Sequence, residues 1–228
     1  MLGAEEASQP LSFAEGAKVT GLYVDIAEEI GRRTGDRVEI RLMPWARCLD
    51  LARSGGIDGI VGALKTEQRQ EFLAYPGEPL MDMTVSLFSH RGVPLAWNGD
   101  YRALADARIG ILASSAQAPA MSKAMADGTL KNIVPSYDYP SLARQLAGGR
   151  IAAAAVVRVP FLATLHNLGL EGEIEEMIPS LDTSPIYIAF SRAHDHAAAI
   201  GRFDKAMAEI RRDGFLNRAL ERYLGPGK

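Results

Sequence analysis

The sequence predicts an α/β protein made of two similar lobes that two extended strands connect. Strand and helix signals alternate along both halves of the chain, and each half holds a strand–helix–strand unit, which gives a parallel pair with a right-handed crossover. A helix end, a double glycine and an apolar strand at residues 51–57 are echoed at residues 146–151. This echo in matching positions favours two related lobes.

Apolar spacing and helix-stop residues define the first half of the chain. Met1 to Ala4 is typical of the end of a strand, and apolar residues recur at helical spacing from Leu22 to a predicted stop at Gly35. Pro44 breaks an alternating strand, and Trp45 begins the next helix. The predicted strands and helices are, in order, residues 1–4, 22–34, 38–42, 45–53 and 57–61.

The second half repeats this plan. Pro119 suits the first turn of a helix that ends near Gly128, and Asp138 is a candidate N-cap for a helix that stops at Gly148. The predicted strands between these helices are residues 108–112, 133–134 and 151–157.

Two β-prone stretches, residues 84–89 and 185–191, are interpreted as hinge strands between the lobes. The tail at residues 197–224 is predicted to be helical with a break at Asp213, and to pack on lobe 1. We therefore expect lobe 1 to comprise residues 1–88 and 188–228, and lobe 2 to comprise residues 89–187.

Composition narrows the classes of function. The chain has 228 residues and a net charge of -3 without a basic stripe, which disfavours nucleic acid as a partner. The longest apolar run, Ile151–Val157, is too short to cross a bilayer. Cys48 is the only cysteine, so no internal disulfide can form, and we expect it to be buried. We expect no signal peptide within the given residues, and interpret the abrupt start as the removal of a preceding segment.

Seven short motifs follow one another along nearly the whole chain. They are Gly21–Ile26, Pro44–Arg47, Ile57–Gly59, Thr66–Arg69, Pro79–Leu80, Tyr187–Ser191 and Asp213–Gly214. In this order and spacing they resemble family 3 extracellular solute-binding proteins, the periplasmic receptors of polar amino-acid ABC importers. The resemblance implies a type II periplasmic-binding-protein-like fold that closes on its ligand. It also implies a periplasmic location, a partner permease in the membrane and no cofactor, and we expect a monomer.

The resemblance assigns roles to several residues of lobe 1. Trp45 matches an aromatic residue that stacks on the ligand side chain, and the backbone of Gly62 and Ala63 matches a strand end that lines the cleft. Thr66 and Arg69 match the polar group and the arginine that bind the ligand carboxylate. An arginine presents a planar fork suited to two parallel bonds with a carboxylate.

In lobe 2, Ser115 matches a serine that binds the same carboxylate, and Ser114, Gln117 and Val157 complete the predicted ligand-binding set. Ser114 and Ser115 stand ahead of the helix near Pro119, where the helix dipole favours an anion.

Two alternatives stay open for the lobe 1 residues. An arginine between Glu67 and Glu71 is usually a solvated helix charge, and a tryptophan beside a proline is usually part of a core.

The chain departs from the family where the ligand ammonium is bound. Val157 occupies the position of the acidic residue expected there, Ser114 replaces a glycine and Ala116 replaces a threonine. A cation without a counter-charge is costly in a dry cleft. Unless Glu5 or Glu6 compensates, we therefore expect a ligand that is not a standard α-amino acid, or one that is held in a changed orientation.

Other polar clusters point to no chemistry. His194 and His196 lack further ligands for a metal and are interpreted as a solvated helix start. The acidic group at residues 173–176 is expected in a solvated loop. No phosphate loop, nucleophile elbow or dinucleotide fingerprint is present.

Two other functions are compatible with the resemblance. One is an enzyme on the same scaffold, similar to cyclohexadienyl dehydratases, although Ser115, Gln117 and Val157 offer no general acid or base. The other is the sensing domain of a signalling receptor.

Overall fold

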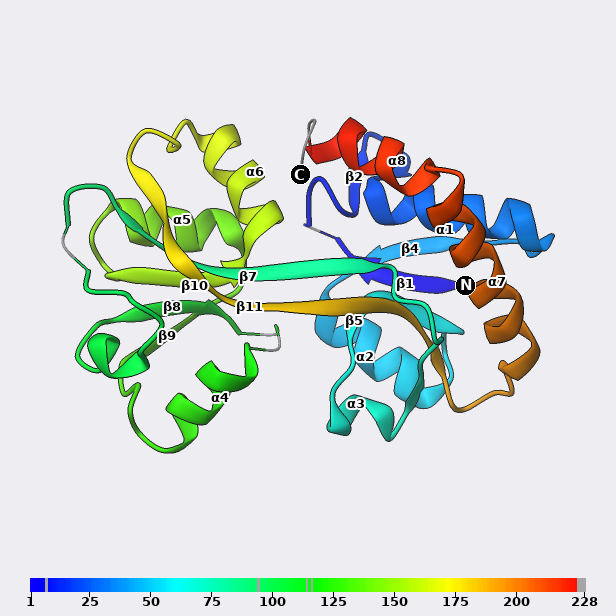
Figure 1. The fold of residues 1–228 in the computed structure, drawn as a ribbon, viewed down its shortest axis with the longest axis horizontal. Helices are drawn as coiled ribbons and strands as arrows, with labels where there is room; N and C mark the ends of the chain where they lie inside the picture. Colours follow the sequence, from blue (N-terminus) through cyan, green and yellow to red (C-terminus); the bar gives the residue numbers. More distant parts are fainter. Residues whose placement is uncertain (7, 94, 114, 116, 225–228) are drawn as a thin grey trace. The chain divides into compact units, whose positions relative to one another are not determined.

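The computed structural model describes residues 1–6, 8–93, 95–113, 115 and 117–224, and the chain forms two compact units (Figure 1). Unit 1 comprises Met1–Asp82 and Pro185–Lys228, and unit 2 comprises Met83–Ser184. The chain passes between the units within two strands, β7 (Met81–His90) and β11 (Ile174–Ser191). Within the described ranges, no helix combines the length and apolarity needed to span a membrane.

The sheet of unit 1 has the order β4–β1–β5–β11. Its three parallel strands are β1 (Leu2–Glu5), β4 (Ile40–Met43) and β5 (Gly59–Leu64). The last residues of β11 pair antiparallel with β5, and with β6 (Leu73–Ala74). A separate hairpin joins β2 (Phe13–Glu15) to β3 (Lys18–Thr20).

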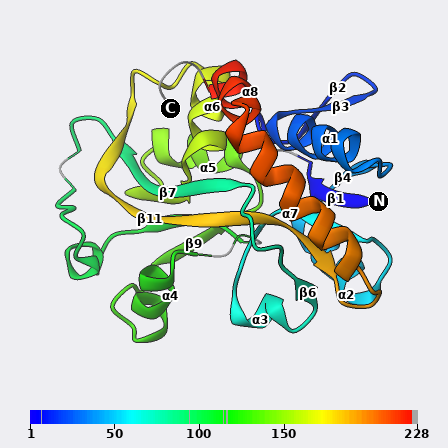
Figure 2. The same cartoon turned by 45° about the vertical axis from the view of Figure 1, so that its right-hand side comes forward.

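The helices of unit 1 cover both faces of this sheet. They are α1 (Leu22–Thr34), α2 (Trp45–Ser54), α3 (Glu67–Gln70), α7 (Ala197–Arg212) and α8 (Phe215–Leu224). In Figure 1, α1 and α2 lie on opposite faces of the sheet, and Figure 2 shows α7 and α8, in orange and red, following one another beside α1. Gly35 and Gly55 end α1 and α2 with φ of 76° and 78°, a left-handed conformation that glycine adopts without strain, so both predicted stops are confirmed.

The sheet of unit 2 has the order β7–β10–β8–β9. Strands β8 (Ile109–Leu112), β9 (Ile133–Ser136) and β10 (Ala153–Val157) are parallel, and β7 is antiparallel to β10. The helices are η1 (Tyr101–Leu104), α4 (Pro119–Ala126), α5 (Tyr139–Ala147) and α6 (Arg158–Leu168). The Asp138 carboxylate accepts the Ser141 N–H at 2.6 Å, which confirms the predicted cap of α5.

The core of each unit follows the predicted apolar faces. Cys48 is fully buried with Ile60 and Ala63, and burial raises the pKa of its thiol to about 12. On one face of the unit 2 sheet, Phe88 of β7 packs with Phe161 of α6 at a ring separation of 4.9 Å. The predicted α/β class is therefore confirmed in both units.

Several local predictions were wrong. The acidic residues Glu175 and Glu176 lie on β11 instead of in the predicted loop. The segment after Val157, for which no element was predicted, forms α6. β11 begins at Ile174, before the predicted hinge strand. Residues 175–185 mix polar and apolar side chains, and none of them is buried, so no alternating pattern marks this part of the strand. Pro160 lies in the first turn of α6 and is compatible with a helix start. The N–H groups of the first turn have no intrahelical acceptor, so a residue without an N–H loses no hydrogen bond there.

Candidate ligand-binding edges

Three connections gather at one edge of the unit 1 sheet. β1 ends at Glu5, β4 continues through Pro44 into Trp45, and β5 continues into Thr66 at the start of α3. Because these strands are parallel, their carboxyl ends lie at the same edge, which is where open α/β sheets bind ligands.

Arg69 is held at this edge by its own short helix. Thr66 is the N-cap of α3, and its hydroxyl oxygen accepts the Arg69 N–H at 3.2 Å. The guanidinium donates through Nη1 to the Leu64 carbonyl at 3.4 Å, and its Cζ lies 5.3 Å from the centre of the Trp45 ring. These contacts fix the direction of the fork and place it over an aromatic face.

The Arg69 side chain carries a buried charge that no carboxylate of the described residues neutralises. Only 8% of the residue is exposed, and burial lowers the pKa of the guanidinium from its ordinary value. Its contacts are a carbonyl oxygen and an aromatic ring, which supply partial negative charge only. The interpretation of Arg69 as a solvated helix charge is therefore wrong.

Trp45 and nearby residues of β5 form the apolar part of this edge. Trp45 is 9% exposed and belongs to the same apolar cluster as Cys48 and Ala63, so its ring is largely core. Gly62 has a φ of 85°, and a Cβ there would stand 2.7 Å from the Tyr23 ring, so the backbone passes close to an aromatic side chain.

Glu5 is a polar residue of this edge for which the sequence analysis left the role open. Its pKa is raised to about 7, chiefly by burial and then by the nearby Glu6, while the Trp45 N–H donates a hydrogen bond that partly offsets these effects. A carboxyl group thus stands at the start of α2, next to the residue whose ring faces Arg69.

Tyr75 and Tyr187 are further residues near Arg69 that sequence reasoning missed. The Tyr75 hydroxyl donates to the Leu64 carbonyl at 2.8 Å, the same oxygen that Arg69 contacts, and its ring is edge-on to Tyr187 at 5.4 Å. Burial raises the pKa of Tyr75 to about 12. The only sequence signal was that Tyr187 stands in the β-prone stretch that pairs with β5.

In unit 2, the loop after β8 holds the predicted serine. The Ser115 N–H donates to the Leu112 carbonyl at 3.2 Å, and the Gln117 side-chain amide donates to the Ser115 carbonyl at 3.0 Å. Gln117 therefore braces this turn ahead of α4. Ser114, also predicted to bind ligand, lies outside the described residues.

Val157 ends β10 and precedes α6 directly, so it stands at the carboxyl edge of the unit 2 sheet. The next residue, Arg158, donates through Nε to both oxygens of Glu176 at 2.9 Å. The Ser86 hydroxyl donates to the same carboxylate at 2.7 Å. The carboxylate of Glu176, which lies beside this edge, is therefore already bound by Arg158 and Ser86.

Neither unit offers a metal centre: across the described ranges, no group of three or more His, Cys, Asp and Glu side chains could hold a metal ion.

Comparison with known proteins identifies the class. The model of the bacterial extracellular solute-binding proteins, family 3, matches residues 1–226. The probable amino-acid-binding protein YxeM of Bacillus subtilis (strain 168) is 20% identical over 232 residues, covering 98% of this chain and 83% of the relative.

Solved structures share the fold. A histidine kinase sensor domain with similarity to periplasmic binding proteins superposes with a TM-score of 0.84 at 22% identity, covering 98% of this chain and 95% of that one. An ancestral arginine-binding protein bound to arginine gives 0.82 at 19% identity, covering 98% and 97%.

The chain therefore belongs to the bacterial extracellular solute-binding proteins, family 3. This confirms the resemblance seen in the sequence motifs, and the two-lobed periplasmic-binding-protein-like fold that the resemblance implied.

Proposed function

We propose that this protein is a receptor that captures a small carboxylate-bearing solute, amino-acid-like or a derivative, and delivers it to an ABC importer. In this proposal it acts in the periplasm, is monomeric, catalyses no reaction and docks on a permease in the membrane. Membership of an extracellular solute-binding family supports the binding role. The name of the relative YxeM, a probable amino-acid-binding protein, supports the class of ligand.

The buried, unpaired guanidinium of Arg69 is the observation that carries the proposal. Burying a charge costs several kcal/mol of folding free energy unless a partner compensates. Because Arg69 is buried without a carboxylate partner among the described residues, an anionic ligand that binds its guanidinium would offset this cost. A carboxylate accepts two parallel bonds from the guanidinium fork, and such charge-assisted bonds are the stronger kind. In the proposal, Thr66 in unit 1 and Ser114, Ser115 and Gln117 in unit 2 contribute further polar groups to this ligand, and Trp45, Gly62 and Ala63 line its apolar part.

Val157 narrows the proposed ligand. An apolar side chain at the end of β10 cannot repay the desolvation of an ammonium group, and the nearby Glu176 is already bound by Arg158 and Ser86. We therefore propose a carboxylate whose α-amino group is absent or modified. The alternative is that Glu5 takes over the ammonium, and the closeness of its carboxyl to Trp45 keeps this alternative open.

A sensing role is the second candidate, and it rests on the fold shared with a histidine kinase sensor domain. An enzyme is a third reading, but the residues placed at the unit 2 edge, Ser115, Gln117 and Val157, include no general acid or base. Pull-down of a permease with the purified full chain would favour transport over sensing.

The test of the proposed function is a melting-temperature screen of small carboxylates, each paired with its carboxamide. A ligand that binds only the folded state raises the melting temperature, and a carboxamide keeps the shape of the carboxylate while removing its charge. We expect at least one carboxylate to stabilise the protein and its carboxamide to fail. If the responding compounds are amides or neutral molecules, the proposal is wrong.

A further inference from the structure

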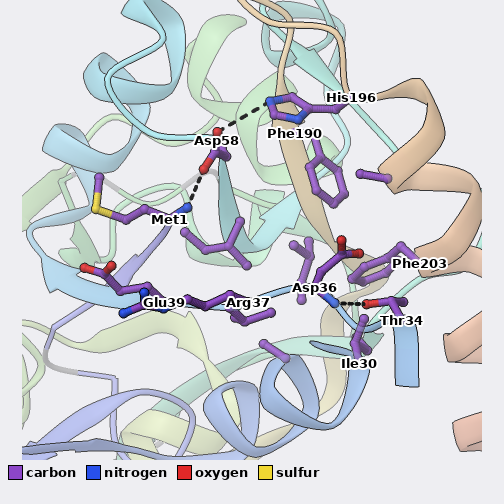
Figure 3. Close-up of a pocket in the computed structure, with 15 residues that line it drawn as sticks. Met1, Ile30, Thr34, Asp36, Arg37, Glu39, Asp58, Phe190, His196 and Phe203 are labelled. Carbon is purple, nitrogen blue, oxygen red and sulfur yellow. Dashed lines mark hydrogen bonds and ion pairs between the residues drawn. The ribbon is translucent and has the colours of Figure 1, made fainter. Parts of the chain in front are cut away.

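Unit 1 contains a cavity of about 240 Å³ at the edge of its sheet opposite to Arg69 (Figure 3). Here β1 begins at Leu2, and Asp58 stands just ahead of the first residue of β5. Because Arg69 follows the carboxyl end of β5, the length of that strand separates the cavity from the proposed carboxylate site. The cavity takes no part in the function proposed above.

The walls of this cavity are mainly apolar and come from four elements of unit 1. Phe203 of α7 and Phe190 of β11 meet edge-on, with ring centres 5.8 Å apart. The remaining buried apolar side chains are Leu2 of β1, Ala27 and Ile30 of α1, and Ile188 of β11. An apolar cavity of about 150 Å³ is large enough to hold benzene, so this one has room for an aromatic ring with a short arm.

His196, which precedes the first residue of α7, places an unused polar atom at the cavity. Its Nε2 is buried and makes no hydrogen bond within the described part of the chain. An unsatisfied buried group costs about 1–3 kcal/mol. The prediction that this histidine is simply solvated is therefore wrong, although its neighbour His194 is exposed, with Nε2 3.1 Å from the Gly55 carbonyl oxygen.

Asp58 faces His196 across the mouth of the cavity. Its Oδ1 lies 3.9 Å from His196 Nε2, too far for a hydrogen bond, while its Oδ2 pairs with the ammonium group of Met1. Figure 3 shows Asp58 between these two groups, with Phe190 and Phe203 beyond His196. Among the described residues, the contact between these two atoms is a long one, drawn dashed in Figure 3, and neither atom makes a hydrogen bond, so both can accept one from the same donor.

We propose that this cavity is a second ligand site, which binds a small amine with an apolar body. The ammonium donates to Asp58 Oδ1 and to His196 Nε2 in its unprotonated form, and the apolar body packs against Phe190 and Phe203. An anionic ligand would meet the charge of Asp58 and is excluded.

The other charges at the mouth leave this arrangement intact. Asp36 is bound by Arg202 at 2.8 Å, and Glu39 by Arg41 at 3.0 Å. Arg37 is exposed, so water screens its charge. Asp58 is then the carboxylate at the mouth that no arginine binds, and it lies next to the buried nitrogen of His196.

The test uses 2-phenylethylamine as the probe and 3-phenylpropionate as the charge-reversed probe, each titrated into the full chain and followed by two-dimensional NMR. We expect the amine to shift signals of Ile30, His196 and Phe203, and to bind at least tenfold more tightly than the carboxylate at these residues. Equal binding of the two probes there, or amine-induced shifts confined to residues far from the cavity, would overturn the proposal.

Two neighbouring alanines of α7 provide a matched pair of variants. Ala199 lines the cavity, whereas Ala198 is exposed and does not. Ala199→Leu should reduce amine affinity at least tenfold, and Ala198→Leu should leave it unchanged. Ala199→Leu binding the amine like the wild type would contradict the proposal.

Asp58→Asn tests the charge without filling the cavity and should also weaken amine binding at least tenfold. It serves as the deciding variant if Ala199→Leu does not fold. Arg69→Ala should leave amine binding unchanged, which separates this site from the proposed carboxylate site.

Discussion

Arg69 in unit 1 and Arg158 in unit 2 follow the carboxyl ends of corresponding strands, β5 and β10, but their charges are treated differently. Arg158 is bound by both oxygens of Glu176, and the Ser86 hydroxyl donates to the same carboxylate. Arg69 is more deeply buried, and its guanidinium contacts only the Leu64 carbonyl and the Trp45 ring among the described residues. Unit 2 thus neutralises its arginine with a carboxylate of its own, whereas the Arg69 charge of unit 1 is left without a carboxylate among the described residues.

The contrast has an energetic meaning. In a buried ion pair, the attraction between the charges offsets their loss of hydration. A single buried cation keeps an uncompensated desolvation penalty, which a bound anion can reduce. The same edge of unit 1 also holds Glu5, whose ionised form is disfavoured by burial. We infer that unit 1 carries most of the binding energy for a carboxylate, and that the Arg158 pair stabilises unit 2.

The largest expected effect comes from exchanging each arginine for alanine. Arg69→Ala should weaken binding of the carboxylate found by the screen by about 2–4 kcal/mol, roughly 30- to 1,000-fold, because a charged hydrogen-bonding partner is lost. Arg158→Ala should change that affinity by less than about 0.5 kcal/mol, but should lower the free energy of unfolding by about 1–2 kcal/mol.

Titration calorimetry and denaturant unfolding measure the two quantities. If Arg158→Ala loses as much affinity as Arg69→Ala, the division of labour between the units is wrong.

A second test concerns the backbone of β5, which carries Gly62 where β10, Ala153–Val157, has no glycine. Gly62→Ala should lower the free energy of unfolding by about 2–3 kcal/mol, since it combines a left-handed φ with a Cβ 2.7 Å from the Tyr23 ring. Gly35→Ala is the control, because Gly35 has a φ of 76° and open space around it. Chemical denaturation of both variants isolates the contribution of the collision, and equal losses would show that Tyr23 simply moves aside.

A third test makes the unit 2 edge acidic. Val157→Asp should improve the affinity for a free α-amino acid by about 2 kcal/mol, since a carboxylate can then pair with its ammonium. Val157→Asn, which has the same shape without the charge, should produce a smaller gain. Micromolar binding of a free α-amino acid by the unchanged protein would sink the idea that Val157 excludes the ammonium, and would point to Glu5.

The sequence predicted the elements whose ends carry local signals. Gly35 and Gly55 end helices because only glycine adopts their left-handed conformation cheaply, and Asp138 caps α5 through its own carboxylate. Position 114 alone among the predicted ligand-binding residues stays outside the described part of the chain.

What the sequence could not predict depends on contacts between distant residues. Glu176 looked solvated in an acidic run, but it is tied to Arg158 and Ser86, which lie 18 and 90 residues away. Glu5 shows the same limit, since its high pKa arises from burial that no local pattern records. Pairing partners and burial are products of the fold, so charge patterns along the chain do not reveal them.

The smallest expected effect concerns Glu5 and the pH dependence of stability. Its pKa rises from 4.5 to about 7 on folding, so between these values the folded state binds more protons than the unfolded one. Stability from this group is therefore fully present below pH 4.5 and is lost as the pH rises through about 7. Because the side chain is only partly buried, solvent screening reduces the loss to about 1 kcal/mol.

Glu5→Gln keeps an oxygen that can accept the Trp45 N–H and should remove this part of the decline in stability. The measurement is the free energy of unfolding of both proteins across this pH range. Parallel curves would mean that Glu5 is ionised without penalty, and that the edge of unit 1 is as well neutralised as the edge of unit 2.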